Sequence, residues 1–283
     1  MTDKSEIILE ARDLYFSYDT DGEYSLKGVD LQIGKGKKIA FMGANGSGKS
    51  TFFLCCNGIH RPAKGQLFFH GQAVDYSKRG LSKLRSKVGI VFQDPDNQLF
   101  SASVFQEISF GILNLGATEE QARAEVEAVM AELNITSFSQ RPTHALSGGQ
   151  KKQVTIADIL VMHPEVIIMD EPFSALDSTH VKLVDDAIHR FTERGITVMM
   201  AIHDMDYAYG WADEIVLLHE GRVLKQGNPD SICRDKDALA LTNLEEPAVL
   251  RLAACLRQKG MIPPGPPTPR NIKQLEEYIE RGR

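Results

Sequence analysis

Apolar residues fall in short, compact runs separated by longer stretches that have one apolar and one polar face. The runs that we interpret as strands are residues 38–42, 88–92, 166–169, 198–202 and 215–218. Stretches with helical character lie between them, most clearly residues 119–133 and 180–194. Strands that alternate with helices are typical of a parallel sheet. The pattern therefore predicts an α/β protein whose mostly parallel sheet is covered on both faces.

Two regions depart from this alternation. Residues 7–39 mix β-like segments, LYFSY and LKGVDLQI, with turn residues at 19–22, which predicts antiparallel strands and hairpins. Residues 94–164 contain no strong strand pattern, and we interpret them as a helical insertion in the α/β core.

The tail of the chain changes character near Asp235. Four prolines flank Gly265 within residues 263–267, which predicts a turn or a rigid spacer. A short helix is expected at residues 272–281. Two interpretations of this tail stay open: a surface appendage without chemistry, or a contact with a partner or a second subunit.

Composition narrows the class of protein. The chain has 283 residues, 42% hydrophobic and 25% charged, which suits one large α/β domain or a domain with a small appendage. Its net charge of −6 disfavours nucleic-acid binding, which needs a basic face, and direct docking on anionic lipid. No apolar run approaches the roughly 20 residues of a membrane span, and the first residues lack a signal-peptide pattern. If the protein works at a membrane, we expect another chain to hold it there.

Cysteine and histidine positions predict no metal centre. None of the cysteines has the spacing of a metal finger or a redox pair, and the eight histidines are scattered. We therefore expect reduced thiols that pack as small apolar groups. The cysteines are Cys55, Cys56, Cys233 and Cys255.

The segment GANGSGKST, residues 43–51, fits the phosphate-loop pattern G-x-x-x-x-G-K-[ST]. Its glycines let the backbone curl so that N–H groups point at phosphate oxygens, and a helix start adds its dipole. Lys49 would contact the β- and γ-phosphates, and Ser50 would ligate Mg²⁺. A chance match in a glycine-rich turn is the alternative, but the strand before and the helix after argue against it. The candidate ATP-binding residues here are Gly43, Asn45, Gly46, Ser47, Gly48, Lys49, Ser50 and Thr51.

A second acidic element, VIIMDE, ends at Asp170 and Glu171. Open α/β sheets bind ligands at the carboxyl ends of their strands, where this apolar run delivers both carboxylates. Asp170 would hold Mg²⁺ through water, and Glu171 would polarise the attacking water as general base. An ordinary acidic strand end is the alternative, which the phosphate loop earlier in the chain disfavours.

The segment LSGGQ, residues 146–150, lies upstream of this acidic strand. Together with the phosphate loop, it makes the chain resemble the ABC ATPases over about residues 7–227. The resemblance implies a phosphate-loop NTPase core with an antiparallel β subdomain and a helical subdomain at about 94–164, within an ATPase domain at 1–235. Residues 236–283 would form a C-terminal extension. It also implies that Ser147, Gly148, Gly149 and Gln150 reach the γ-phosphate bound on a second subunit, so that two ATP molecules lie between two subunits.

Further matches to the family follow in the expected order. Gln93 resembles the glutamine that senses Mg²⁺ and water, and Asp177 resembles the residue that crosses the dimer seam. His203 resembles the switch histidine that contacts the γ-phosphate. Tyr18 resembles the aromatic residue that stacks on adenine, although the nearby Tyr15 and Phe16 suit a core role equally well.

Two positions depart from the family pattern. Gln153 stands where the family usually has arginine after LSGGQKK, and Phe173 stands where threonine is frequent after DEP. Neither position carries the hydrolytic chemistry directly. We expect the first departure to weaken the packing of the signature helix.

Residues 91–111, VFQDPDNQLFSASVFQEISFG, indicate a subtype. The run resembles the ATPases of cobalt/nickel and energy-coupling-factor vitamin importers. That resemblance implies a transmembrane coupling protein docked near residues 94–100, a small membrane protein that binds the cargo, and a peripheral position on the cytoplasmic face of the membrane. A good turn sequence, Asp-Pro-Asp-Asn, is the alternative, but it does not explain the whole run.

Other function classes stay open beside the importer. ABC ATPases also act on DNA or ribosomes, but those carry two such domains or a long coiled coil, and often basic surfaces. A weakly hydrolysing subunit of a cell-division complex is a third hypothesis. Neither the cargo nor the identity of the partner ATPase, an identical or a related chain, follows from the sequence.

Overall fold

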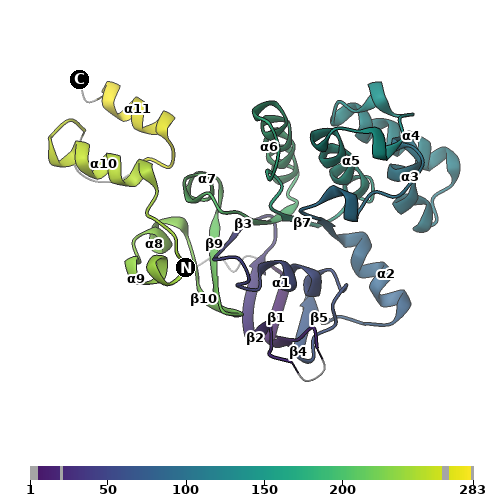
Figure 1. Ribbon diagram of the computed structural model, residues 1–283, viewed down its shortest axis with the longest axis horizontal. Helices are drawn as coiled ribbons and strands as arrows, with labels where there is room; N and C mark the ends of the chain where they lie inside the picture. Colours follow the sequence, from purple (N-terminus) through teal and green to yellow (C-terminus); the bar gives the residue numbers. More distant parts are fainter. Residues whose placement is uncertain (1–5, 20–21, 263–267, 282–283) are drawn as a thin grey trace.

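The computed structural model describes residues 6–19, 22–262 and 268–281, and a six-stranded sheet lies at its centre (Figure 1). The strand order is β10-β9-β3-β8-β7-β6, parallel except for the antiparallel edge strand β10. The predicted α/β class and the mostly parallel sheet are therefore confirmed. The strands are β3 (Lys38–Met42), β6 (Val88–Val91), β7 (Val166–Asp170), β8 (Thr197–Ala201), β9 (Glu214–His219) and β10 (Arg222–Gly227).

A second, four-stranded antiparallel sheet has the order β2-β1-β4-β5. Strand β1 pairs with both β2 and β4, so that Ala11 lies opposite Leu31 on one side and Leu67 on the other. The antiparallel strands expected in residues 7–39 are confirmed, while residues 20 and 21 of the expected turn lie outside the described residues. The strands are β1 (Ile7–Phe16), β2 (Leu26–Gly34), β4 (Lys64–Phe69) and β5 (Gln72–Ala73).

Alternation along the parallel strands divides the interior into two cores. Ile39 and Phe41 of β3 face helix α1 (Lys49–Cys56) and the antiparallel sheet, where Phe41 contacts the ring of Phe53 at a centroid distance of 5.0 Å. Ala40 and Met42 face the helices on the opposite side. Successive side chains of a strand point to opposite faces of the sheet. A fully apolar strand therefore needs other elements packed on both of its faces. The prediction of a sheet covered on both faces is thus confirmed.

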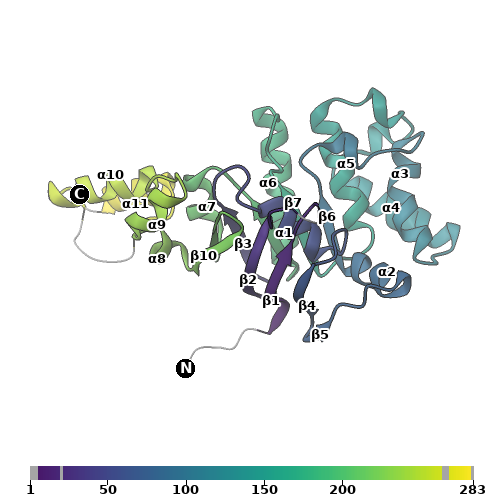
Figure 2. The ribbon, with the colours of Figure 1, turned by 60° about the horizontal axis from the view of Figure 1, so that its bottom comes forward.

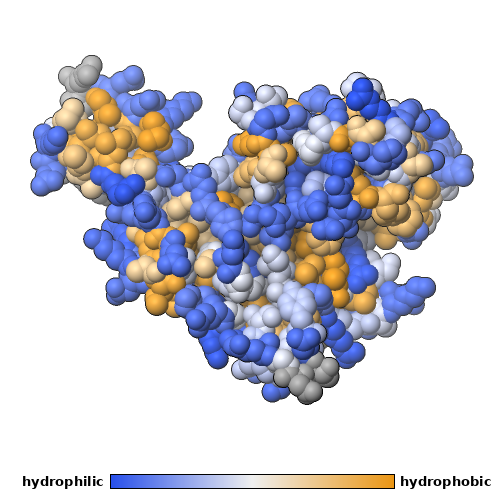
Figure 3. Space-filling view, in the orientation of Figure 1, coloured by the Kyte–Doolittle hydropathy of each residue, from blue (hydrophilic) through white to orange (hydrophobic). Residues whose placement is uncertain are grey.

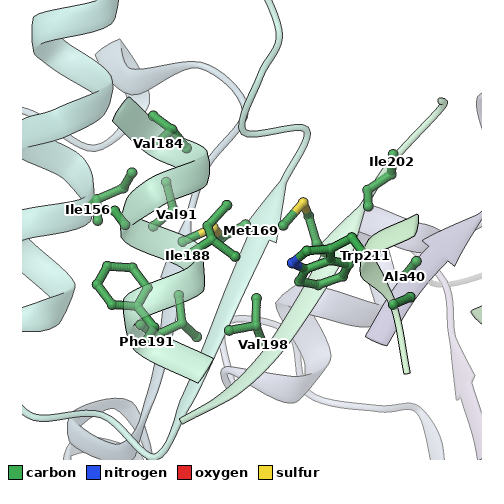
Figure 4. Packing of buried hydrophobic residues seen from close by; sticks show 14 of the residues in the cluster. Ala40, Val91, Ile156, Met169, Val184, Ile188, Phe191, Val198, Ile202 and Trp211 are labelled. Carbon is green, nitrogen blue, oxygen red and sulfur yellow. The ribbon is translucent and has the colours of Figure 1, made fainter. Parts of the chain in front are cut away.

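Helix α6 (Ser178–Glu193) packs across the helical face of the sheet. Its buried residues Ile188 and Phe191 lie against strand residues such as Met169 and Val198 (Figure 4). The indole of Trp211, from α7 (Met205–Trp211), extends the same core toward β3. This layer fixes the ends of β7 and β8, which carry the acidic and histidine residues singled out above.

Residues 94–164 form helices and no strand, as expected from their pattern. They gather at one end of the molecule in both ribbon views (Figures 1 and 2). Capping boxes begin two of the helices, at Thr118 and at Ser147. The elements are η1 (Pro95–Asn97), α3 (Val104–Asn114), α4 (Glu119–Glu132), η2 (Thr136–Phe138), η3 (Thr143–Ala145) and α5 (Gly148–Leu160).

The tail extends from the other end of the molecule (Figure 2). The guanidinium of Arg270 fastens it to the end of α7, because Nε donates to the carbonyl of Tyr209 and Nη2 to that of Ala212, each at 2.7 Å. The helix predicted at 272–281 is confirmed, and the proline segment 263–267 lies outside the described residues. The helices are α8 (Pro229–Cys233), α9 (Lys236–Leu241), α10 (Ala248–Gln258) and α11 (Ile272–Arg281). The division of the chain at residue 235 stays a prediction.

Helix α2 (Lys78–Lys87) was not expected from the sequence, and only Leu84 of its residues is buried. Its residues are mostly charged or polar, so the sequence offered few apolar positions from which to predict a helix. Among the helices of the described segments, none is both long and apolar enough to cross a membrane.

Gly89 of β6 gives a test of the packing between the sheet and α5. A Cβ atom at this position would lie 2.0 Å from Cγ2 of Ile159. We expect Gly89→Ala to lower the free energy of unfolding by about 1–3 kcal/mol, since overpacked cores must distort. Urea unfolding monitored by circular dichroism measures the change.

The Ile159→Ala background supplies the control for this prediction. Removing Ile159 alone opens a cavity, but in the double variant the added methyl group has room. We expect the double variant to lose clearly less free energy of unfolding than the sum of the losses in the two single variants. Simple additivity would show that the two side chains do not compete for the same space.

Candidate functional site

The carboxyl ends of four parallel strands meet at one edge of the central sheet. Strand β8 lies between β3 and β7, and β6 follows β7, so the segments after these strands converge. They surround an open cleft of about 540 Å³. The residues that line it are Tyr18, Ser25, Asn45, Gly46, Gly48, Lys49, Ser50, Thr51, Gln93, Glu171 and His203. Residues that are far apart in the sequence are thus brought together as predicted.

The loop after β3 has a backbone that only glycine adopts readily. Gly43, Gly46 and Gly48 have φ angles of 142°, 79° and 104°. A Cβ atom on Gly43 would also lie 2.2 Å from the carbonyl oxygen of Leu218, so no larger residue fits there. The loop leads directly into α1, whose N-cap residue Gly48 provides no side-chain cap. The first amides of the helix are therefore available to an anion in the cleft.

Lys49 supplies the positive charge of this loop. The residue is 6% exposed, and its Nζ donates to the carbonyls of Gly43 at 2.8 Å and Ala44 at 3.1 Å. Burial lowers the pKa of Lys49, and the carboxylates of Glu171 and Asp170 offset part of that effect. The ammonium is thus fixed at the base of the loop, beside both acidic residues.

The carboxylate of Glu171 is held by residues from two other loops. Gln93 Nε2 donates to Oε2 at 2.8 Å, and His203 Nε2 lies 2.7 Å from Oε1. Glu171 itself has a φ of 45°, a backbone region that is strained for a residue with a side chain. Strained backbone of this kind clusters at functional sites, and here it turns the carboxylate toward Gln93 and His203.

Asp170 lies next to the loop and has a different environment. Its carboxylate is partly buried, and burial raises its pKa although the Ser50 hydroxyl donates a hydrogen bond to it. Hard cations such as Mg²⁺ bind oxygen ligands, usually one or two carboxylates together with substrate phosphates. The hydroxyl of Ser50, the carboxylate of Asp170 and the amide oxygen of Gln93 fit that preference.

Tyr18 stands at the rim of the cleft with 61% of its surface exposed. Its hydroxyl lies 3.0 Å from Oγ1 of Thr51, and its ring makes edge-on contacts with Phe16 and His60. The exposed ring can therefore accept a planar ligand, whereas Phe16 is buried in the core. Ser25 also lines the cleft, and no sequence signal marked it.

The LSGGQ segment lies elsewhere in the same chain. None of Ser147, Gly148, Gly149, Gln150 and Asp177, all within the described residues, lines the cleft. Ser147 caps α5 and Asp177 caps α6, where Oδ1 accepts from the backbone of His180 at 2.9 Å. The two helix starts pack closely, since a Cβ atom on Gly149 would lie 2.1 Å from the His180 ring. One chain therefore assembles only part of the predicted set in a single cleft.

The two departures from the family pattern have distinct surroundings. Gln153 is 7% exposed and donates from Nε2 to the carbonyl of Leu133 at 3.0 Å, beside a hollow of about 70 Å³ between α5 and α6. The weaker packing expected from this residue stays a prediction. Phe173 packs edge-on against Tyr207 with ring centroids 5.0 Å apart, and it does not line the cleft.

Lys152 is, after Ser25, a second residue near the site that the sequence did not single out. It is 1% exposed, and its Nζ donates to the carbonyls of Phe92 at 2.9 Å and Gln93 at 2.8 Å. Burial lowers its pKa to about 8, against the opposing effect of nearby carboxylates such as Asp170. Lysine side chains are rarely buried in proteins, so the sequence alone gave no indication that Lys152 lies in the interior beside the site.

Comparisons with known proteins agree with these observations. The family model described as "ABC transporter" matches residues 26–174. A putative ABC transporter ATP-binding protein of Clostridium perfringens is 42% identical over 255 residues, which cover 90% of this chain and 89% of the relative. The energy-coupling factor transporter ATP-binding protein EcfA of Methanocaldococcus jannaschii is 39% identical, with coverage of 90% and 91%.

Solved structures give the same result. The structure of cbiO1 from Clostridium perfringens, described as part of the ABC transporter complex cbiONQ, has a TM-score of 0.74 and 40% identity. It covers 89% of this chain and 99% of its own. A dimeric ATP-binding cassette bound to ADP and Pi, in a post-hydrolysis state, has a TM-score of 0.72 and 26% identity, with coverage of 78% and 99%.

Proposed function

Because the chain belongs to the family of ABC transporter ATP-binding proteins, we propose that the cleft after β3 is its ATPase site and that hydrolysis there drives an importer. The observation that carries this proposal is the carboxylate of Glu171, held at 2.8 Å by Gln93 and at 2.7 Å by His203. General bases need this kind of fixed orientation next to the phosphates that they serve. Lys49, at the base of the same cleft, supplies the phosphate-binding charge.

The phosphates of ATP bind in the loop 43–48 and at the start of α1. Backbone N–H groups and the helix dipole stabilise anions at such a position, and Lys49 adds a full charge. Thr51 fixes the hydroxyl of Tyr18, whose exposed ring stacks on adenine. The loop residues that surround the phosphates are Gly43, Asn45, Gly46, Ser47, Gly48, Lys49, Ser50 and Thr51.

Ser50, Asp170 and Gln93 would hold Mg²⁺, which would supply positive charge against the transferred phosphoryl group. Glu171 accepts the proton of the attacking water, and His203 keeps the carboxylate turned toward the cleft. The imidazole of His203 is about half exposed and lines the cleft, so that a γ-phosphate can compete with Glu171 for it. The residues of this chain therefore supply orientation and proton transfer.

Two subunits complete each site. The Ser147–Gln150 segment does not line the cleft of its own chain. It begins a helix whose capping box does not use the amides of Gly148 and Gly149, which suits the phosphate bound on a second subunit. Asp177 begins the neighbouring helix α6 and lies at the same seam. The dimeric cassette among the similar structures supports this arrangement. The second subunit is a further copy of this chain or a related ATPase.

The transmembrane coupling protein docks near residues 94–100, where the helical region begins. Phe100 is 66% exposed and contacts the half-exposed ring of Phe110 edge-on at 4.9 Å, which offers an aromatic surface next to the Gln93 segment. Relatives named as energy-coupling factor ATPases and the cbiONQ structure support a transmembrane coupling protein, together with a small membrane protein that binds cobalt, nickel or a vitamin. The chain would then lie peripherally on the cytoplasmic face of the cell membrane.

The C-terminal extension, residues 236–283, is a contact for the second subunit or another partner. Apolar side chains gather on the face of α10 and α11 that Figure 3 shows in orange. Leu252, Met261 and Ile272 are each about half exposed on this part of the chain. Exposed apolar patches of this kind mark interaction surfaces more often than free surface.

Replacement of the general base separates binding from turnover. We expect Glu171→Gln to lower steady-state ATP turnover by about 100-fold or more, because the amide cannot accept the proton. Binding of a fluorescent ATP analogue should stay within about twofold of that of the unchanged protein. Unchanged turnover would remove Glu171 from the role of base.

If two subunits form each site together, a change at Ser147 should affect ATP hydrolysis but not the binding of ATP to the monomer. We expect Ser147→Arg to abolish hydrolysis, because a bulky cation blocks the seam, while the monomer still binds the ATP analogue. The matched control is Lys49→Ala, which should lose binding by about 10- to 100-fold since a charged hydrogen-bond donor is removed. Loss of binding in Ser147→Arg would argue that each subunit forms its site alone.

The transport assignment is tested by the partners of the native protein. A tagged pull-down from detergent-solubilised membranes, followed by mass spectrometry, should recover a coupling membrane protein and a small cargo-binding membrane protein. The ATPase-dead Glu171→Gln variant serves as a second bait that favours the closed dimer. Recovery of a conventional permease pair, or of soluble partners only, would contradict the energy-coupling assignment and leave the ATPase site intact.

A further inference from the structure

Lys152 joins the signature helix to the loop that carries Gln93. It lies in α5, five residues after Ser147, and its ammonium donates to the carbonyls of Phe92 and Gln93. A buried ammonium is tolerated only when its protons are used and its charge is balanced. Both conditions are met here, by the two carbonyls and by the neighbouring carboxylates Asp170 and Glu171.

Two other contacts tie the same loop to α5. Lys151 Nζ lies 2.5 Å from Oδ1 of Asp96, and Gln98 Nε2 donates to the carbonyl of Thr155 at 2.9 Å. The ion pair between Lys151 and Asp96 lies at the protein surface, whereas the side chain of Lys152 is buried where the loop leaves β6. Residues 92–98 are thus held by three positions of α5, namely 151, 152 and 155.

This attachment bears on the geometry of the proposed base. The side-chain amide of Gln93 donates to Glu171, and the backbone carbonyl of the same residue accepts from Lys152. A shift of the Gln93 backbone would therefore move the amide away from the carboxylate. Displacements of about 1 Å at a reacting group can cost 100-fold in rate.

We propose that Lys152 is a positioning residue for ATP hydrolysis, which fixes Gln93 opposite Glu171 and makes the Gln93 loop move together with the signature helix. The inference rests on the ATPase function proposed above. Its substance is mechanical: a displacement of residues 92–98 is passed to the start of α5, and so to Ser147, by the buried ammonium group of Lys152 in addition to the Lys151 and Gln98 contacts. An apolar side chain of the same length would fill the space but leave two carbonyls without donors.

The test compares Lys152→Met with Lys152→Arg, which keeps the charge and the donors. We expect Lys152→Met to lower kcat by about tenfold or more while KM for ATP stays within about threefold, because the phosphate loop is untouched. Lys152→Arg should recover a large part of kcat. Lys83→Met, at an exposed position of α2, is the matched control and should match the unchanged protein.

Hydrogen exchange distinguishes a lost attachment from general instability. In Lys152→Met, amides of residues 92–98 should exchange at least about fivefold faster, while peptides from β1 and α1 keep their protection. An unchanged kcat, equal losses in kcat and ATP affinity, or faster exchange throughout the molecule would each overturn the proposal. Parallel assays of Glu171→Gln keep the two hypotheses apart: if that variant is inactive while Lys152→Met is fully active, the ATPase site stands and the role of Lys152 falls.

Discussion

The site depends on the charge balance between two buried ammonium groups and two partly buried carboxylates at the edge of the parallel sheet. Lys49 and Lys152 each lie close enough to Asp170 and Glu171 for the opposite charges to offset part of the loss of hydration. Unpaired charges of this kind would be expelled or neutralised by proton transfer. The phosphate loop, the Gln93 loop and the acidic strand are thus held in one place by a single charge balance.

The parts of the site that are contiguous in sequence could be predicted from it. The phosphate loop and the acidic pair each follow an apolar strand, and a glycine pattern or two adjacent carboxylates need no tertiary information. Gln93 and His203 were assigned only through family resemblance, and the structure brings both to Glu171. Lys152 could not be found because its burial depends on the approach of a loop 59 residues earlier in the chain.

The fold was predictable to the same degree and for a similar reason. Strands buried on both faces stand out as continuous apolar runs, and β3 was predicted with its observed bounds. Strands β4, β5 and β10 were not predicted, because exposed edges and short pairings leave little apolar pattern. Helix α2 was missed because a single buried leucine sets no period. Tertiary pairing supplies the stability that these elements lack on their own.

The cap at the start of α5 has a consequence for hydrogen-bond direction. The oxygen of Ser147 accepts from the backbone N–H of Gln150, so one of its lone pairs is committed inside the helix start. A hydroxyl that accepts in this way still has its own proton, and the cap leaves that proton free to point away from the helix. An ionised aspartate would cap the helix as well, but its carboxylate has no proton to donate and would present negative charge to an arriving anion. Serine thus caps the helix and remains a hydrogen-bond donor. The start of α5 therefore presents donors, and no negative charge, to a ligand that approaches it.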